Sequence, residues 1–265
     1  EEVRFSARDG VPLAAWWNPA PAPARGVVVL AHGRESNRAG MLPRARFLVR
    51  SGFDVLDLDL RLHGGSGGSY MTPGYFEARD VLGAVDWLER RGARGPVVLL
   101  GHSYGAVAVL HAAAQSPRVA AVIADAAFIH PVDMMGRSAA SVRRDPGTPL
   151  PLRLALALYR APFLDRVANW VFRLRTGAWF TNGDAAALAA VRKLHAPAVL
   201  FLAGELDPIA PPADARRLLD ETAAPLKRLM VLPGATHATY GTARAAWQNA
   251  ALAFLDSVAP GPAGR

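Results

Sequence analysis

The feature that most constrains the fold is an alternation of short apolar segments with amphipathic ones. The apolar segments read "GVVVLAHG" (26–33), "FDVLDLDL" (53–60), "PVVLLG" (96–101), "VAAVIAD" (119–125), "PAVLFLAG" (197–204) and "KRLMVLPG" (227–234). Segments between them, such as "YFEARDVLGAVDWLERRG" (75–92), repeat apolar residues at a spacing near 3.6, which predicts helices. Buried strands that alternate with helices belong to parallel sheets covered on both faces. We therefore predict an α/β fold with a mostly parallel sheet.

Two regions depart from this alternation. Residues 2–7 and 12–17 are extended segments around "RDG", a combination that predicts a hairpin. Residues 128–193 contain no clear strand, and most of this stretch is expected to be helical. An insertion between two core strands at this point would lie over the carboxyl edge of the sheet, where α/β proteins bind ligands. We therefore predict one domain over residues 1–265, with a helical lid at about 128–193.

Composition excludes several kinds of chemistry. The chain has no cysteine, so a thiol nucleophile, a disulfide framework and a zinc–thiolate site are ruled out, and we expect neither a metal nor a cofactor. The formal net charge is +8, and Lys193 and Lys227 are the only lysines. The arginines are spread along the chain without a nucleic-acid-binding motif, so no nucleic-acid partner is expected. We favour a cytoplasmic location, although a signal or anchor that preceded Glu1 would leave no trace here.

A serine lies between two glycines where an apolar strand meets an alanine-rich helix. The sequence there is Gly101-His102-Ser103-Tyr104-Gly105. Gly-x-Ser-x-Gly in a strand–turn–helix context is the nucleophile elbow, whose strained backbone lifts the hydroxyl above the sheet. Larger side chains at the two glycine positions would collide as the strand and helix close together. We therefore predict that Ser103 is a catalytic nucleophile.

Such a serine needs a base to take its proton and a carboxylate to orient that base. His237, in "VLPGATHATYG", follows the last predicted strand, and Asp207, in "VLFLAGELDPIAP", follows the strand before it. The order serine, acid, histidine is the one that this architecture requires. Asp125 and Glu205 remain as alternative acids. If Asp125 does not fill that role, we expect a buried carboxylate that accepts backbone hydrogen bonds.

The oxyanion formed during attack on a carbonyl needs two backbone N–H donors. We predict that one belongs to Tyr104, the residue after the nucleophile. The other is expected from Arg34, in the loop that follows the first apolar strand. The imidazole of His32 is expected to brace that loop.

The quoted motifs together resemble the α/β-hydrolase superfamily. "AHGRESN", "DLDLRLHGGSGG", "GHSYGA", "AGELDPIAP" and "GATH" occur in its order and spacing, over about residues 1–127 and 194–258, and look most like its bacterial esterase and serine-aminopeptidase branches. The resemblance implies the α/β-hydrolase fold, the roles given above to Ser103, His237 and Asp207, and structural roles for Asp59 and His63. A serine nucleophile disfavours haloalkane dehalogenases and epoxide hydrolases. His-Gly-Arg-Glu in place of His-Gly-Gly-Gly argues against the hormone-sensitive-lipase branch.

The segment 128–193 supplies the candidate substrate-binding residues. Its aromatic side chains could form an apolar acyl pocket or only pack within the lid; they are Tyr159, Phe163, Trp170, Phe172, Trp179 and Phe180. An apolar pocket favours small carboxylic esters of short or medium acyl chains as substrates. Amide, peptide or thioester hydrolysis and acyl transfer on the same triad are the alternatives, and a non-catalytic binding module is the least favoured. The lid arginines would also suit an anionic membrane, but we favour a cover over the pocket.

Overall fold

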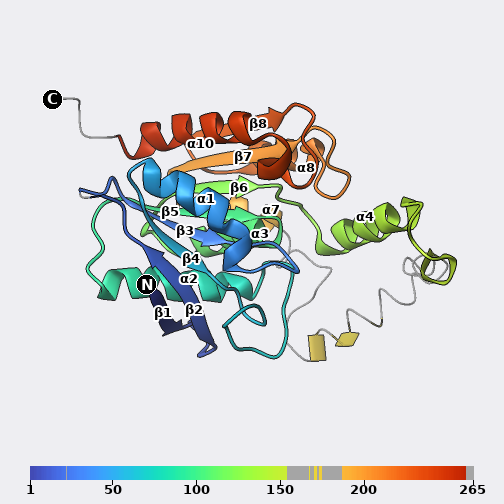
Figure 1. Ribbon diagram of the computed structural model, residues 1–265, viewed down its shortest axis with the longest axis horizontal. Helices are drawn as coiled ribbons and strands as arrows, with labels where there is room; N and C mark the ends of the chain where they lie inside the picture. Colours follow the sequence, from blue (N-terminus) through green and yellow to red (C-terminus); the bar gives the residue numbers. More distant parts are fainter. Residues whose placement is uncertain (22, 154–166, 168–169, 172, 175–186, 261–265) are drawn as a thin grey trace.

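The computed structural model describes the chain except for residues 22, 154–166, 168–169, 172, 175–186 and 261–265. Its described strands form one sheet (Figure 1). They are β1 (Glu2–Ser6), β2 (Pro12–Asn18), β3 (Val27–Ala31), β4 (Asp54–Leu58), β5 (Val97–His102), β6 (Val119–Asp125), β7 (Ala198–Gly204) and β8 (Leu226–Leu232). The predicted hairpin is β1 and β2, which pair antiparallel around residues 7–11.

The sheet has eight strands in the order β1-β2-β4-β3-β5-β6-β7-β8. β2 pairs antiparallel with β4, and every pair from β4 to β8 is parallel. From β3 the chain crosses to β4 on one side and later to β5 on the other. The carboxyl ends of β3 and β5 therefore flank the point where the strand order reverses, and α/β sheets bind ligands at such a point. The prediction of a mostly parallel α/β sheet is confirmed.

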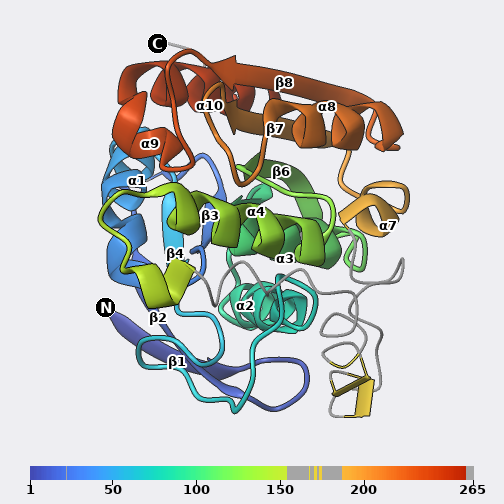
Figure 2. The ribbon, with the colours of Figure 1, turned by 90° about the vertical axis from the view of Figure 1, so that its right-hand side faces the viewer.

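Helices cover both faces of the sheet. The described helices are α1 (Arg38–Arg50), α2 (Glu77–Arg90), α3 (Tyr104–Ala113), α4 (Pro131–Arg144), α7 (Ala187–Val191), α8 (Pro212–Glu221), α9 (Thr239–Thr242) and α10 (Arg244–Val258). Figure 2 shows the sheet between the two groups of covering helices. α1 and α10 pack on one face, where Leu30 meets Met41 and Trp247 in one apolar cluster. α2, α3, α7 and α8 pack on the other face, around Val29, Leu99 and Phe201.

The elements differ from the sequence-based expectation in two places. The last helix, expected from about Thr242 to Ser257, is α10, but the short helix α9 precedes it and was not expected; Ala243 between them has φ −135° and ψ 46° and is not helical. β8 is one of the two edge strands of the sheet, and several of its side chains are exposed, including Met230. The burial of both faces that was predicted for the strands is therefore incomplete at β8.

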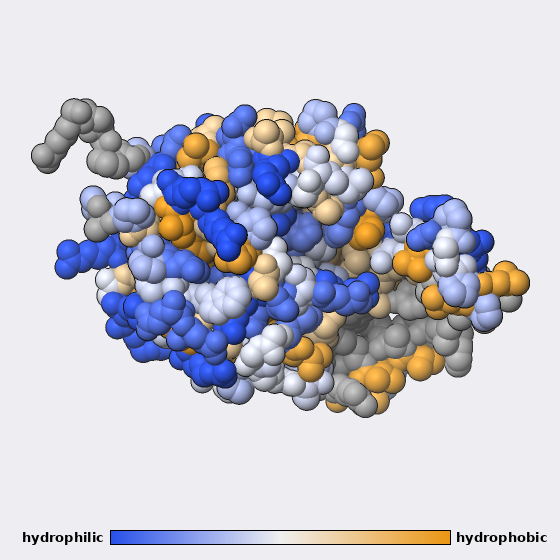
Figure 3. All heavy atoms as spheres, viewed as in Figure 1, coloured by the Kyte–Doolittle hydropathy of each residue, from blue (hydrophilic) through white to orange (hydrophobic). Residues whose placement is uncertain are grey.

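The inserted segment begins with α4, which projects beyond the carboxyl ends of the parallel strands (Figure 1). Hydrophobic residues reach the surface of this projecting part (Figure 3). In the sequence after α4, Leu150 is 67% exposed. α4 buries Met134 on its inner side. Within the described ranges, no helix combines the length and the apolar character that crossing a bilayer would require.

Candidate active site

Ser103 occupies a strained turn between β5 and α3. Its backbone angles are φ 53° and ψ −112°, in the left-handed region that non-glycine residues rarely adopt. The Ser103 N–H donates to the Asp125 carbonyl oxygen at 2.8 Å, which anchors the turn to the end of β6. The side chain is almost buried, with the residue 6% exposed. The predicted nucleophile-elbow conformation is therefore present.

The two flanking glycines are required by backbone contacts. A Cβ atom at Gly101 would overlap the Gly105 carbonyl and lie 2.6 Å from the Ala106 nitrogen. A Cβ atom at Gly105 would overlap the Ala31 carbonyl and lie 2.6 Å from the His32 carbonyl oxygen. These atoms belong to main chain in the sheet and helix, so they cannot move aside cheaply. The collisions expected from the sequence are confirmed.

A chain of two hydrogen bonds joins Ser103 to a histidine and a carboxylate. His237 Nε2 lies 2.9 Å from Ser103 Oγ, and His237 Nδ1 lies 2.7 Å from Asp207 Oδ2. Asp207 lies in the turn after β7, where its Oδ1 accepts hydrogen bonds from the N–H groups of Ile209 (2.8 Å) and Ala210 (3.0 Å). The side chain of Asp207 is fully buried. An acceptor-only carboxylate facing Nδ1 favours the tautomer in which Nδ1 carries the proton and Nε2 accepts from the serine.

The two alternative acids lie elsewhere. Glu205 accepts the Gly234 N–H at 2.8 Å, in the loop after β8. Asp125 is fully buried at the end of β6, where Arg44, Thr239 and Trp247 donate to its carboxylate. These donors are side chains, whereas backbone donors were predicted from the sequence. That expectation was wrong, because β6 ends against α1, α9 and α10 and their side chains reach the carboxylate first.

The loop after β3 lies directly against the elbow. A Cβ atom at Gly33 would be only 3.3 Å from Ser103 Cβ, so glycine permits the close approach. His32 Nδ1 donates to the Gly33 carbonyl at 2.7 Å, and His32 Nε2 accepts from the Leu60 N–H at 3.1 Å. Burial lowers the pKa of His32 to about 4, so its imidazole is neutral and can accept that bond. His32 therefore braces the loop, as expected from the sequence.

The two predicted oxyanion donors lie on neighbouring segments at this point. Arg34 follows Gly33, Tyr104 follows Ser103, and both residues line the same pocket as Ser103. The Arg34 guanidinium carbon lies 6.0 Å from the centre of the Tyr104 ring, which brings the two residues together from β3 and β5. The assignment of their backbone N–H groups to an oxyanion hole remains a prediction.

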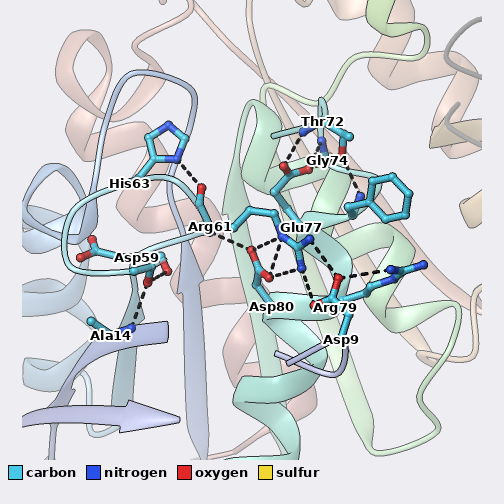
Figure 4. A network of polar contacts seen from close by, with 12 residues as sticks. Asp9, Ala14, Asp59, Arg61, His63, Thr72, Gly74, Glu77, Arg79 and Asp80 are labelled. Carbon is cyan, nitrogen blue, oxygen red and sulfur yellow. Dashed lines mark hydrogen bonds and ion pairs between the residues drawn. The ribbon is translucent and has the colours of Figure 1, made fainter. Parts of the chain in front are cut away.

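A polar network that includes Asp59, Arg61 and His63 organises the loop after β4 (Figure 4). Asp59 also accepts hydrogen bonds from the Arg38 N–H at 2.8 Å and the Gly65 N–H at 2.7 Å. The His63 ring packs against the His32 ring with centroids 4.9 Å apart. Asp59 and His63 therefore tie the loop after β4 to α1 and to the bracing histidine. This agrees with the structural roles implied by the family resemblance.

The pocket beside Ser103 has a volume of about 310 Å³. Its walls come from the loop after β3 and the start of α1, from the turns that carry Ser103 and His237, and from α4. α4 contributes Met134 and Ser138, and the turn after β7 contributes Ile209. These three residues were not predicted from the sequence. The spacing of Met134 and Ser138 places both on one side of a helix, but sequence cannot say which side faces the serine.

The aromatic candidates from the insertion have little structural description. Tyr159, Phe163, Phe172, Trp179 and Phe180 lie outside the described residues. Trp170 is described and is 58% exposed. The described residues that line the pocket come from other segments, so a substrate-binding role for Trp170 remains a prediction.

The described part of the chain offers no cluster of three or more histidine, aspartate or glutamate side chains that could hold a metal ion. Its chemistry-bearing groups are instead a serine, a histidine and a carboxylate in series. In principle, such a series can transfer the serine proton to the histidine while the carboxylate balances the resulting charge.

A mostly parallel eight-stranded sheet, with a strained serine turn at the end of β5, defines the α/β-hydrolase class of proteins. The chain belongs to the alpha/beta hydrolase family, whose family model matches residues 28–250.

Comparisons with individual proteins agree with this family. The uncharacterized protein YqkD of Bacillus subtilis is 27% identical over 246 residues, which cover 91% of this chain and 75% of that protein. An esterase from Pyrococcus furiosus has a similar structure, with a TM-score of 0.76, 22% identity and coverage of 98% of this chain and 92% of the esterase. An esterase from Thermogutta terrifontis has a TM-score of 0.65 and 21% identity, with 98% and 99% of the two chains covered.

Proposed function

We propose that this protein is a serine hydrolase that cleaves carboxylic esters of short or medium acyl chains. The observation that carries the proposal is the continuous hydrogen-bonded series Ser103–His237–Asp207, with bonds of 2.9 and 2.7 Å, at the edge of a pocket. Both distances lie in the range in which a base can take a proton from a nucleophile. Both structural neighbours described above are esterases, which supports this reaction class.

The mechanism has two half-reactions. His237 Nε2 takes the proton from Ser103 Oγ as Oγ forms a bond to the ester carbonyl carbon. The electron pair of the C=O bond moves onto oxygen, where the N–H groups of Arg34 and Tyr104 would hold the oxyanion. As the carbonyl reforms, the ester C–O bond breaks and His237 gives its proton to the leaving alcohol. An acyl group then remains on Ser103.

Water completes the cycle. It enters after the alcohol leaves, gives its proton to His237 and attacks the acyl carbon. The second tetrahedral intermediate collapses, the bond to Ser103 breaks, and Ser103 regains its proton from His237. Throughout, Asp207 holds the Nδ1 side of the ring and stabilises the imidazolium.

The size of the pocket supports a small substrate. Its volume of about 310 Å³ equals that of roughly ten water molecules at liquid density. This lies at the small end of the range for ligand pockets, which begins at roughly 300 Å³. An acyl chain of a few carbons and a small alcohol would fill such a space.

We further propose that the chain is one domain whose residues 128–193 form a lid. Met134 and Ser138 support this, because they bring α4 into the pocket wall above Ser103. Under this proposal the lid sets acyl specificity, and single alanine replacements of Trp170, Phe172, Trp179 and Phe180 test it. At least one should change the acyl-length preference by about tenfold. Unchanged preferences together with weaker binding to anionic vesicles would instead make the lid a membrane-facing element.

The proposed function is tested by covalent labelling and a substrate panel. A fluorophosphonate probe should label the protein once, and Ser103→Ala should abolish the label. Chromogenic esters of increasing acyl length, run beside an aminoacyl anilide, should show the highest kcat/KM for short or medium esters. Labelling that persists in Ser103→Ala would overturn the nucleophile assignment. Faster cleavage of the anilide would overturn the ester specificity.

A further inference from the structure

Behind the site lies a buried carboxylate that the mechanism above does not use. Asp125 is completely buried at the carboxyl end of β6. Its Oδ2 accepts from Arg44 at 2.9 Å and from the indole N–H of Trp247 at 3.0 Å, and its Oδ1 accepts from the Thr239 hydroxyl at 2.6 Å. The residue therefore joins β6 to α1, α9 and α10 at a single point.

The partners of Asp125 lie next to both proposed reacting residues. His102, whose Nδ1 is 3.5 Å from Asp125 Oδ2, immediately precedes Ser103. Thr239 follows His237 by two residues. In addition, the Asp125 carbonyl oxygen accepts the Ser103 N–H at 2.8 Å. One residue thus holds the chain beside the nucleophile through its backbone and the chain beside the base through its side chain.

The register of the sheet explains this placement. His102 of β5 pairs with Asp125 of β6 at the carboxyl ends of the two parallel strands. The nucleophile turn begins one residue later, so Asp125 lies beside it, and the Asp125 carbonyl oxygen accepts the Ser103 N–H. The base is carried by the short connection from β8 to α9, and Thr239, the first residue of α9, is fully buried.

The charge of Asp125 is balanced inside the protein. The Arg44 side chain is 9% exposed, and its guanidinium carbon lies 4.8 Å from the Tyr240 ring centre and 5.4 Å from that of Trp247. Burial alone would raise the pKa of Asp125, but the neighbouring His102 ring and the Arg44 charge together hold it well below its usual range. The carboxylate is therefore ionised, and the Arg44–Asp125 pair adds no net charge near the base.

We propose that Asp125 is a positioning residue that fixes the His237 loop relative to Ser103 through the Thr239 hydroxyl, with Arg44 as its counter-ion. This inference rests on the proposed function, because it assigns Ser103 and His237 their reacting roles. The physical reason is distance. Proton transfer requires His237 Nε2 to stay within about 3 Å of Ser103 Oγ. A displacement of about 1 Å at a reacting group can cost about a hundredfold in rate.

The first test removes only the tether. Thr239→Val replaces the hydroxyl by a methyl group of similar size and leaves the other partners of Asp125 in place. The rate constant for fluorophosphonate labelling of Ser103 and the kcat for ester should both fall at least about tenfold, with KM within about twofold. Thr239→Ser restores the hydroxyl and should recover most of the rate.

A matched control removes another buried threonine hydroxyl. Thr222, at the end of α8, contacts the Val191 carbonyl at 3.4 Å and lies away from the pocket. Thr222→Val should change thermal stability without changing the labelling rate. Equal labelling rates in Thr239→Val and the wild type, or a Thr239→Ser variant as slow as Thr239→Val, would overturn the proposal. A wild-type protein that is not labelled at Ser103 would instead overturn the proposed function.

The second test removes the negative charge of Asp125 and measures the pH dependence of kcat/KM. Five described segments place charged or titratable groups around His237 or its pocket. They are the end of β5 with the turn after it (His102 and Ser103), the turn after β7 (Asp207), the loop after β3 (Arg34 and Glu35), α1 (Arg44) and the end of β6 (Asp125). The centre of the His102 ring is 5.3 Å from that of the His237 ring. Burial lowers the pKa of His102, so the His102 ring is neutral.

Asp125→Asn leaves the Arg44 charge unbalanced beside this group. A positive charge disfavours a protonated base near it. Because the base must be unprotonated to act, the acid limb of the kcat/KM profile should move to lower pH. The double variant Asp125→Asn with Arg44→Met removes both charges and should move the limb back. If the Asp125→Asn protein folds and its acid limb does not move, the proposal that Asp125 balances the charge of Arg44 is contradicted. If Asp125→Asn does not fold, the Thr239 variants decide the proposal alone.

Discussion

Asp207 Oδ2 and His237 Nδ1 lie 2.7 Å apart although 30 residues separate them in the sequence. The contact forms because β7 and β8 are adjacent parallel strands, so the turns that follow them meet at one edge of the sheet. Two backbone N–H groups fix the other oxygen of Asp207, which leaves Oδ2 to orient the imidazole. The carboxylate thus has one oxygen for its own turn and one for the histidine.

This contact predicts a large kinetic effect of Asp207→Asn. The asparagine amide would present a donor to Nδ1 and favour the wrong tautomer, so kcat/KM should fall by about 10⁴ while the fold persists. Ester hydrolysis and fluorophosphonate labelling measure the effect. Glu205→Gln is the control, because Glu205 bonds to Gly234 rather than to the histidine. A larger loss in Glu205→Gln than in Asp207→Asn would refute the assignment of the acid.

The pocket wall predicts a change in specificity from Met134→Ala. Met134 is 3% exposed and lines the pocket from α4, so its truncation should open space for additional methylene groups. The ratio of kcat/KM for a longer ester over a shorter one should rise by about tenfold. Met135→Ala is the matched control: Met135 packs partly buried against the core, and the described pocket lining does not include it. Equal ratios in the two variants would argue that α4 does not shape the acyl site.

The glycines of the elbow predict a stability effect. Gly101→Ala places a Cβ atom onto the Gly105 carbonyl, so β5 and α3 would have to separate. We expect a loss of about 3 kcal/mol or more in the free energy of unfolding. Gly147→Ala is the control, because its Cβ atom would meet only Asp145 Oδ1, at 3.4 Å. Urea unfolding of both variants checks the prediction. A Gly101→Ala protein as stable as Gly147→Ala would mean that the elbow can relax.

Glu77 predicts that stability depends on pH. It is buried at the start of α2, where it accepts hydrogen bonds from Thr72 and Gly74 (Figure 4). Burial raises the pKa of Glu77 to about 7, against an ordinary value of 4.5. The folded state therefore binds the proton more tightly than the unfolded state. The resulting stabilisation is complete below about pH 4.5 and is lost as the pH rises to about 7.

A shift of this size corresponds to about 3 kcal/mol. Relative to Glu77→Gln, the wild-type free energy of unfolding should therefore decline by up to about 3 kcal/mol between pH 4.5 and 7.5. Other buried carboxyls with raised pKa values, Asp57 and Asp80, are present in both proteins, and their contributions cancel in the comparison. Parallel stability curves for the wild type and Glu77→Gln would show that Glu77 does not titrate in this range.

The sequence by itself determined the layers of the fold and the conformation around Ser103. Apolar strands and amphipathic helices follow from periodicity, which is a local property of the chain. The steric demand at Gly101 and Gly105 is also local, because it arises where one strand turns directly into one helix. The meeting of Ser103, Asp207 and His237 could be predicted from the sequence because each residue follows a predicted strand. Parallel strands end at the same edge of a sheet.

The tertiary structure alone decided which carboxylate meets the histidine and what surrounds the other. Asp125 and Asp207 both end strands, so local pattern does not separate them. The strand order and the register of β5, β6 and β7 carry Asp207 to His237 and bury Asp125 among Arg44, Thr239 and Trp247. Likewise, α4 places Met134 in the pocket wall, and the spacing of residues in the sequence does not show which side of this helix faces the pocket. These contacts depend on how distant elements pack, and no local stretch of sequence holds that information.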